Sequence, residues 1–178
     1  MTRFTAIFDA CVLYPAPIRD LLLELAQTEL FRARWTNRIH DEWIRALLES
    51  RPDLSRERLY RTRELMNQSV PDCLITDYEE LISSLTLPDL DDRHVLAAAI
   101  KGRADVIVTL NVRDFPAPAL AAFGIEAQHP DEFIVHHFHL SQVAVCQAAK
   151  AVRGRLTRPS KTVDSTYPRT RRVGRTRH

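Results

Sequence analysis

Two short apolar runs, far apart in the chain, constrain its fold most strongly. The first covers residues 5–8 and the second covers residues 105–110, where Val and Ile are concentrated. Both are short for a helix, and neither alternates apolar with polar residues, so each is typical of a strand buried on both faces. Because such strands occur in parallel sheets that are covered by helices, we expect an α/β fold.

Periodic segments between and after these runs predict the helices that cover the sheet. The helical patterns, with prolines between the periodic segments, lie at residues 18–32, 39–49, 56–67, 94–102 and 141–152. Two further short strands are expected, one at residues 73–76 and an edge strand at 126–128. Strands that alternate with helices in this way predict a central parallel sheet flanked by helices.

Length and composition indicate one globular domain of ordinary size. The 178 residues, 45% of them hydrophobic, are enough for a substantial core and an extension. No run of about 18 apolar residues occurs and the N-terminus lacks a signal-peptide pattern, so we expect a cytoplasmic protein without a membrane segment. The cysteines Cys11, Cys73 and Cys146 form no CxxC pair, which argues against a disulfide framework or a structural zinc site.

The net charge of +2 conceals an asymmetry between the body and the end of the chain. Residues 150–178 contain ten Lys or Arg and one acid, a charge of +9, so residues 1–149 carry −7. This contrast indicates either a polyanionic partner or a tail that folds back onto acidic surface. We expect residues 1–140 to form the main domain, 141–155 a C-terminal helix and 156–178 a basic, poorly ordered tail.

Four acidic side chains stand where a strand ends or a helix is expected to begin. They are Asp9 after the first apolar run, Asp114 just past the second, and Glu42 and Asp92 at predicted helix starts. An acid at one such position is more often a helix cap or a turn residue than a ligand. All four together are harder to explain in that way, because ligands of open parallel sheets bind beyond the carboxyl ends of the strands.

Carboxylates that converge in one pocket predict a divalent cation. Like charges at short range raise each other's pKa and resist ionisation, whereas grouped hard oxygen ligands are what Mg²⁺ or Mn²⁺ prefers. Bound divalent ions can activate a nucleophile and stabilise negative charge during phosphodiester cleavage. The pattern therefore favours a magnesium-dependent nuclease.

Several segments resemble the PIN domain family, in particular the VapC-like toxin ribonucleases of bacterial toxin–antitoxin modules. The similarity extends over residues 4–135 and lies in FDACVLYP, TNRIHDEWIRAL, LPDLDDRHVLAAAI, ADVIVTLNVRDFP and FGIEAQHPDEF. The resemblance implies a three-layer α/β sandwich and a metal-dependent endoribonuclease that leaves 5′-phosphate and 3′-hydroxyl ends. It also implies RNA as substrate and a cognate antitoxin as partner. Single-stranded or loop RNA is the expected class, and a homodimer is left open.

The resemblance also assigns roles to individual residues. Its acidic quartet corresponds to Asp9, Glu42, Asp92 and Asp114, with Asn111 as polar support of the site. Asp9, Asp92 and Asp114 would hold Mg²⁺, with Mn²⁺ as a substitute, and Glu42 would be a further ligand or an orienter of the attacking water. Asp91 is the reserve candidate for Asp92. The cations near the motifs that could contact RNA phosphates are Arg93, Arg113 and Lys101.

The chain departs from the family pattern at three places. The run of Asp89, Asp91 and Asp92 leaves the third carboxylate ambiguous, with Asp92 the better match and Asp91 in reserve. Cys11 stands where many members have Asn, which removes an amide but no proposed metal ligand. After residue 164 the sequence lacks the amphipathic helix that this subgroup usually has, so the Arg-rich tail has two interpretations: nonspecific phosphate binding, or a solvated end without a role.

Competing functions are weakened by specific residues. A haloacid-dehalogenase-type phosphatase needs a second Asp where Cys11 stands, and a dinucleotide-binding domain needs a GxGxxG motif that the chain lacks. A catalytically silent PIN-like module that binds RNA or a partner protein stays open. We expect His94 to pack at a helix start, the cluster at residues 136–139 to be surface histidines, and both tryptophans to be core or interface residues.

Overall fold

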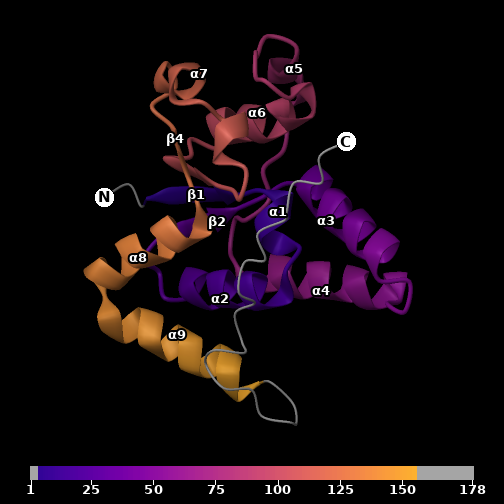
Figure 1. Ribbon diagram of the computed structural model, residues 1–178, viewed down its shortest axis with the longest axis vertical. Helices are drawn as coiled ribbons and strands as arrows, with labels where there is room; N and C mark the ends of the chain where they lie inside the picture. The colour runs from indigo at the N-terminus through magenta and orange to yellow at the C-terminus, as the bar shows by residue number, and fades with distance from the viewer. Residues whose placement is uncertain (1–3, 156–178) are drawn as a thin grey trace, which may run out of the picture.

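A central sheet of parallel strands lies between layers of helices in the computed structural model, which describes residues 4–155 (Figure 1). The strand order is β2-β1-β3-β4, and every neighbouring pair is parallel. The predicted α/β sandwich is therefore confirmed.

The elements in chain order are β1 Thr5–Phe8, α1 Ala10–Leu13, α2 Ala16–Ala26, β2 Arg32–Arg34, α3 Asn37–Ser50, α4 Arg56–Ser69, α5 Glu79–Ile82, the 3-10 turn η1 Leu90–Asp92, α6 Arg93–Lys101, β3 Val106–Val108, the 3-10 turn η2 Val112–Asp114, α7 Ala117–Ala121, β4 Glu126–Gln128, α8 Pro130–Leu140 and α9 Gln142–Gly154.

The two apolar runs form the centre of the sheet. Every residue of β1 and β3 is buried, as expected for strands with helices on both faces. On one face, α6 packs on both strands through a small-residue surface that includes Ala97 and Ala98. On the other face, the Phe8 ring contacts the rings of Phe31, Trp35 and Phe133.

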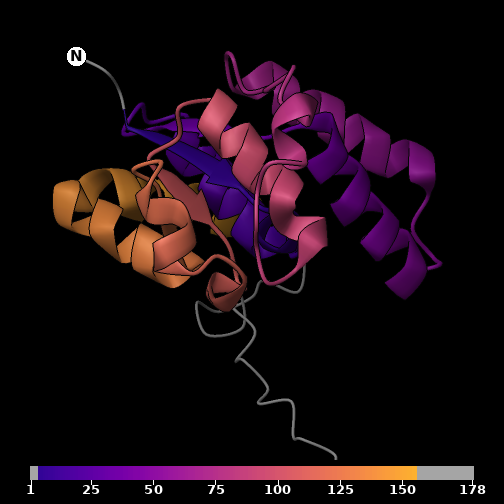
Figure 2. The same cartoon turned by 90° about the horizontal axis from the view of Figure 1, so that it is seen from above.

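The remaining helices complete the two outer layers. Figure 1 shows α5 and α6 above the sheet and α2, α4 and α9 below it, and α9 packs against α2 and α8. Figure 2, the view from above, shows the α8 region and the α3–α4 pair at opposite ends of the molecule. No helix in the described part of the chain is long and apolar enough to cross a membrane.

The strand order creates a switch point beside β1. The chain passes from β1 to β2 on one side, and later returns to place β3 on the other side. In open parallel sheets such a reversal leaves a crevice at the carboxyl ends of the two strands, where ligands bind. Here those ends are followed by Asp9 and Thr109, since Phe8 is paired with Val108.

Two predicted elements were wrong or incomplete. The helix expected at residues 18–32 ends at Ala26, and Arg32–Arg34 instead pairs with β1 as an edge strand. A segment as short as Arg-Ala-Arg has no periodicity of its own, so only the partner strand decides its conformation. The strand expected at 73–76 is reduced to a single bridge between Trp35 and Leu74, whereas the edge strand at 126–128 is confirmed as β4.

The core explains other side chains that the sequence analysis interpreted. Both tryptophans are fully buried, and all three cysteines are free. The expectation of surface histidines was wrong for His137, which is buried because its Nδ1 pairs with the carbonyl oxygen of Phe133 one helical turn earlier. The tail at residues 156–178 lies outside the described residues.

A buried polar network ties α3 and α4 to β2. The Asn67 Oδ1 atom accepts hydrogen bonds from Trp35 Nε1 at 2.8 Å and from His40 Nε2 at 2.9 Å. Trp43 Nε1 in turn donates to His40 Nδ1 at 3.0 Å. Because the Trp43 indole can only donate, His40 Nδ1 must be the acceptor, so the network selects the neutral tautomer with its proton on Nε2.

Acid should destabilise the protein through His40. Burial lowers the pKa of His40 from its usual value to about 4, so between that pH and about 6.5 the unfolded chain binds a proton that the folded chain does not. The stability contributed by neutral His40, roughly 3 kcal/mol, is therefore complete above about pH 6.5 and is lost as the pH falls toward 4. Urea unfolding at a series of pH values should show that the free energy of unfolding falls less steeply with decreasing pH in His40→Gln than in wild type. Equal slopes in His40→Gln, wild type and the exposed-site control His139→Gln would exclude this assignment.

Candidate functional site

Three of the four predicted carboxylates, those of Asp9, Glu42 and Asp92, line one cavity at the switch point between β1 and β3. This cavity has a volume of about 830 Å³, and its lining includes Asp9, Glu42, Asp91, Asp92 and Asn111. These residues come from the end of β1, the middle of α3, the start of α6 and the segment after β3. Tertiary structure thus brings four distant segments to one edge of the sheet.

Asp9 is held rigidly at the end of β1. Its side chain is only 5% exposed, and its backbone N–H continues the β1–β3 ladder by donating to Val108. One carboxylate oxygen accepts from the Ala10 N–H at 2.8 Å and the other accepts from Thr109 Oγ1 at 2.9 Å. Burial raises the pKa of Asp9, the hydrogen bonds from Thr109 and Ala10 oppose that rise, and the Glu42 carboxylate adds to it.

Thr109 connects the two strand ends, although the sequence analysis did not single it out. Its hydroxyl donates to Asp9 and accepts the Asn111 N–H at 3.1 Å. Cys11 completes the group, because its sulfur lies 3.4 Å from the Thr109 hydroxyl and accepts the Leu110 N–H at 3.3 Å. Burial and the adjacent Asp9 charge raise the Cys11 pKa to about 12, so this thiol is protonated at neutral pH.

Asp92 directs its carboxylate toward the other acids. It stands at the N-cap position of α6 but makes no side-chain capping hydrogen bond, so the helix-cap explanation does not account for its carboxylate. Burial raises its pKa to about 7, and repulsion from Asp9, Asp89 and Asp114 adds to the rise. Its neighbour Asp91, the reserve candidate, is exposed on the same cavity wall.

Asp114 and Asn111 belong to the short turn that follows β3. Asn111 lines the cavity, and as the N-cap of η2 it makes no side-chain capping bond, which leaves its amide available. Asp114 is the last residue of η2 and is not among the residues that line the cavity. Its charge nevertheless acts on Asp92, so it lies at the margin of the acidic group.

Glu42 reaches the site from the interior of a helix rather than from a helix start. The expectation that it opens a helix was wrong, because α3 begins at Asn37, where the Thr36 hydroxyl caps the Ile39 N–H at 3.0 Å. Glu42 Oε1 lies 2.7 Å from His94 Nε2 and 3.9 Å from Arg38 Nε. Its other oxygen has no protein partner among the described residues.

His94 therefore has a larger role than packing. It is 1% exposed and sits on the first turn of α6, where it holds the Glu42 carboxylate beside the segment that carries Asp92. Its Nδ1 atom is buried without a hydrogen-bond partner, so the contact with Glu42 is the only one that orients this ring among the described residues.

The donor set suits a hydrated magnesium ion better than a fully enclosed one. Within residues 4–155, no three His, Cys, Asp or Glu side chains are grouped closely enough to hold a metal ion by themselves. Mg²⁺, however, usually keeps several waters and takes only one or two carboxylates together with substrate phosphates. Burial is the main cause of the raised pKa values of Asp9 and Asp92, and neighbouring carboxylates add to both, an effect that a cation would offset.

The basic residues are distributed differently from the prediction. Arg93 lies beside Asp92, with its Nε bonded to the Leu90 carbonyl at 3.1 Å, and Arg113 is exposed on η2. Lys101 lies at the far end of α6 and lines a different cavity. The cations that do line the acidic cavity are Arg38 and Arg45 of α3, which the sequence analysis did not propose.

Comparisons with known proteins agree with this architecture. The PIN domain family model matches residues 5–113, and the VapC50 C-terminal domain model matches residues 130–176. The second match includes the tail that the sequence analysis considered divergent, so that interpretation was wrong for residues up to 176.

One similar protein is named "Putative ribonuclease VapC50" and comes from Mycobacterium tuberculosis (strain ATCC 25618 / H37Rv). The two are 44% identical over 75 residues, which are 42% of this chain and 41% of that relative. The match thus spans less than half of the relative's length. No solved structure gives a significant match. The PIN domain family model matches more than half of the 178 residues of this chain, so the chain belongs to the PIN domain family.

Proposed function

We propose that this protein is a Mg²⁺-dependent endoribonuclease and the toxin of a type II toxin–antitoxin module. The observation that carries the proposal is the convergence of Asp9, Glu42 and Asp92 on one cavity at the carboxyl edge of the sheet. Burial and neighbouring acids raise the pKa of Asp92, so its charge is unfavourable in this place. A stable fold gains nothing from this arrangement without a cation, whereas a metal-dependent phosphodiesterase uses it. The name of the mycobacterial relative supports RNA as the substrate.

Asp9 and Asp92 would hold one or two Mg²⁺ ions, with Mn²⁺ as a substitute, and Asp114 would add its charge from the margin of the acidic group. Bound there, the metal would supply a nucleophile at neutral pH and stabilise charge on the phosphoryl oxygens. Thr109 and the Ala10 N–H keep the Asp9 carboxylate in one orientation. His94 donates to Glu42 Oε1, which leaves Oε2 free to orient a water molecule or to act as a further ligand.

The polar residues around the carboxylates would position the RNA backbone. The Asn111 side chain faces the cavity without a capping bond and could hold a phosphate oxygen or a water molecule. Arg38 and Arg45 stand on the α3 wall of the same cavity, where cations can offset the repulsion between phosphates and the acidic body. Arg93 and Arg113 remain candidates for further phosphate contacts.

Purified protein should cleave single-stranded RNA when Mg²⁺ or Mn²⁺ is present and should stop in excess EDTA. Sequencing of the products should find 5′-phosphate and 3′-hydroxyl ends, because an activated water attacks the phosphorus in the proposed reaction. Cleavage that continues in EDTA, or products with 2′,3′-cyclic phosphates, would contradict the proposal. Metal-dependent RNA binding without any cleavage would instead favour the silent PIN-like module.

The toxin assignment predicts growth arrest that a partner can relieve. Overproduction in a bacterial host should stop growth, and co-expression of the reading frame beside the gene should restore it if that frame encodes the antitoxin. The matched control is the Asp9→Asn variant, which should be harmless because it lacks a proposed metal ligand. If cells that produce the wild type and cells that produce Asp9→Asn at equal protein levels grow equally well, the toxin assignment is contradicted and the nuclease assignment is not affected.

A further inference from the structure

A second cavity lies at the opposite edge of the sheet from the carboxylates. It has a volume of about 1060 Å³ and surrounds the starts of β1, β2 and β3. Its lining carries four cations, Arg32, Arg34, Lys101 and Arg103, and none of the predicted catalytic acids. The catalytic proposal therefore does not account for this cavity.

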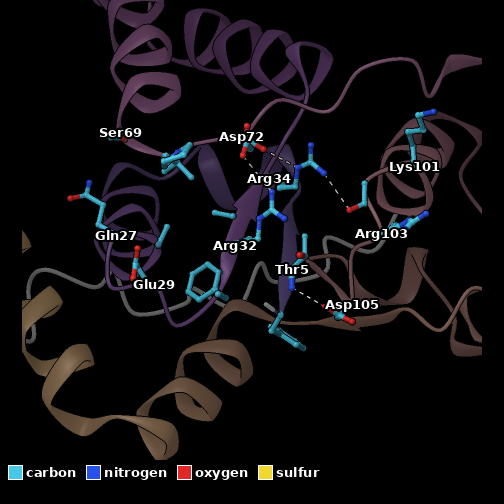
Figure 3. Close-up of a pocket in the computed structure, with 17 residues that line it drawn as sticks. Thr5, Gln27, Glu29, Arg32, Arg34, Ser69, Asp72, Lys101, Arg103 and Asp105 are labelled. Carbon is cyan, nitrogen blue, oxygen red and sulfur yellow. Dashed lines mark hydrogen bonds and ion pairs between the residues drawn. The ribbon is translucent and has the colours of Figure 1, made fainter. Parts of the chain in front are cut away.

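The cations come from two walls that face the same space. Arg32 and Arg34 are separated by one residue on β2, so their side chains project from the same face of this edge strand. Lys101 ends α6, and Arg103 lies in the turn after it. Figure 3 shows Arg34 between Asp72 on one side and the segment with Lys101 and Arg103 on the other.

The positive charge of this group is compensated in part, because the carboxylates of Glu29, Asp72 and Asp105 line the same cavity as the four cations. Arg32 Nη2 lies 3.8 Å from Asp72 Oδ2, and that carboxylate is 81% exposed. Among the described residues, no carboxylate lies within 4.0 Å of the charged nitrogens of Arg34, Lys101 or Arg103. Of the nearby acids, Asp105 already accepts the Thr5 N–H at 2.8 Å.

Arg34 is fixed in place before any ligand arrives. Its Nε donates to the Asp72 carbonyl at 3.0 Å, Nη1 to the Gly102 carbonyl at 3.3 Å and Nη2 to the Leu74 carbonyl at 3.4 Å. These carbonyls use three of its five N–H donors and carry only partial charges, so two donors and most of the positive charge remain. Burial and the neighbouring Arg32 lower the Arg34 pKa, and the Asp72 carboxylate opposes this effect.

The backbone around the cavity is also unusual. Glu29, Asp72 and Arg103, with φ of 64°, 54° and 52°, all line it, and each has a left-handed conformation that costs a residue with a Cβ atom. A helix usually places glycine at such a position after its last turn. In this chain the glycine, Gly102, stands one residue before the position with positive φ, and a Cβ at Gly102 would lie 2.6 Å from Ile75 Cδ1. Arg103 therefore has the left-handed conformation that glycine usually adopts.

We propose that this cavity is a binding site for a phosphate group, carried by a nucleotide or by an RNA strand. The cations of the lining outnumber its carboxylates, and among the described residues no carboxylate lies within 4.0 Å of the charged nitrogens of Arg34, Lys101 or Arg103, so the cavity favours an anion. Guanidinium groups offer the paired donors that phosphate oxygens accept. The volume exceeds that of a phosphate ion, and Phe4, 36% exposed on the lining, offers a ring against which a base can stack.

The C-terminal end of α6 carries the negative end of the helix dipole, which repels an anion. Arg34 donates to the Gly102 carbonyl at this end, and Lys101 and Arg103 lie beside it, so these cations offset the dipole. Because the site lies at the far edge of the sheet, it does not depend on the nuclease activity. Binding can be measured in EDTA, where failure of the catalytic proposal would leave this result unchanged.

Calorimetric titration of the full chain with inorganic phosphate, in a phosphate-free buffer with EDTA, tests the site. Arg32→Gln and Arg103→Gly should each weaken binding roughly three- to tenfold, since each removes one partly exposed charge contact. Arg103→Gly should also melt at or above the wild-type temperature, because glycine relieves the positive φ. This opposite response separates a binding role from a role in folding.

Arg61→Gln is the matched control, since Arg61 is an exposed arginine of α4 outside this cavity and its loss changes the net charge equally. Wild-type affinity in Arg32→Gln and Arg103→Gly, or no binding of phosphate to wild type, would overturn the proposal. Competition by AMP, with adenosine as its uncharged control, would identify a nucleotide as the ligand. Competition by a short single-stranded RNA, but not by AMP, would identify an RNA strand.

Discussion

Asp9→Asn should reduce Mg²⁺-dependent RNA cleavage by on the order of 10³-fold, because a metal ligand contributes several kcal/mol of transition-state stabilisation. The amide oxygen can still accept from the Ala10 N–H, and the amide NH₂ can donate to the Thr109 hydroxyl where the carboxylate accepted from it, so the local structure should persist. Without metal, the variant should melt no lower than wild type, since burial and repulsion raise the Asp9 pKa and make its charge unfavourable. Initial cleavage rates on a labelled RNA, with melting curves for each variant, measure both effects.

Two further variants make this prediction specific. Asp41→Asn removes an exposed carboxylate from the rim of the same cavity and should retain most of the activity. Comparison of Asp91→Asn with Asp92→Asn should show the larger loss for Asp92, whose pKa is raised to about 7 by burial and by the other acids. Mg²⁺ should raise the melting temperature of wild type and much less that of Asp92→Asn. Full activity in both Asp9→Asn and Asp92→Asn would contradict a catalytic role for these carboxylates.

Asn67→Leu should lower the free energy of unfolding by about 3 kcal/mol, because it leaves two buried donors without an acceptor at roughly 1–3 kcal/mol each. Those donors are Trp35 Nε1 and His40 Nε2, and both residues are fully buried. Urea denaturation at neutral pH measures the change. Gln68→Leu, the same kind of substitution at an exposed neighbour on α4, should change stability little. If both variants unfold at the same midpoint, the network does not stabilise the junction of β2, α3 and α4.

Local pattern was enough to predict the elements with the strongest apolar signals. Both central strands could be predicted, because the runs at residues 5–8 and 105–110 are short and rich in Val, Ile, Phe and Ala, side chains that folding buries. The acids after them could be proposed as a site from sequence, since the carboxyl ends of parallel strands share one edge of the sheet. By contrast, Arg32–Arg34 has no local preference, and only pairing with β1 makes it a strand.

The partners of each carboxylate depended on register and packing. Asp9 meets Thr109 because Phe8 pairs with Val108, and a shift of one residue would turn Thr109 to the other face. Glu42 meets His94 because α3 packs beside the start of α6, although the two are distant in sequence. Residue spacing in the sequence cannot predict such a contact, because it depends on how the connections between strands arrange α3 and α6 around the sheet.

The sequence by itself determined the α/β class and the central strands, because burial and strand ends follow from residue type and local order, and it allowed the four acids to be proposed as a site. Only the tertiary structure decided which side chains share a cavity. It placed Glu42 inside a helix against His94, and it moved Lys101 to the far edge of the sheet. The physical reason is that a helix carries its two ends to opposite edges, so Asp92 and Lys101 are neighbours in sequence and opposite in space.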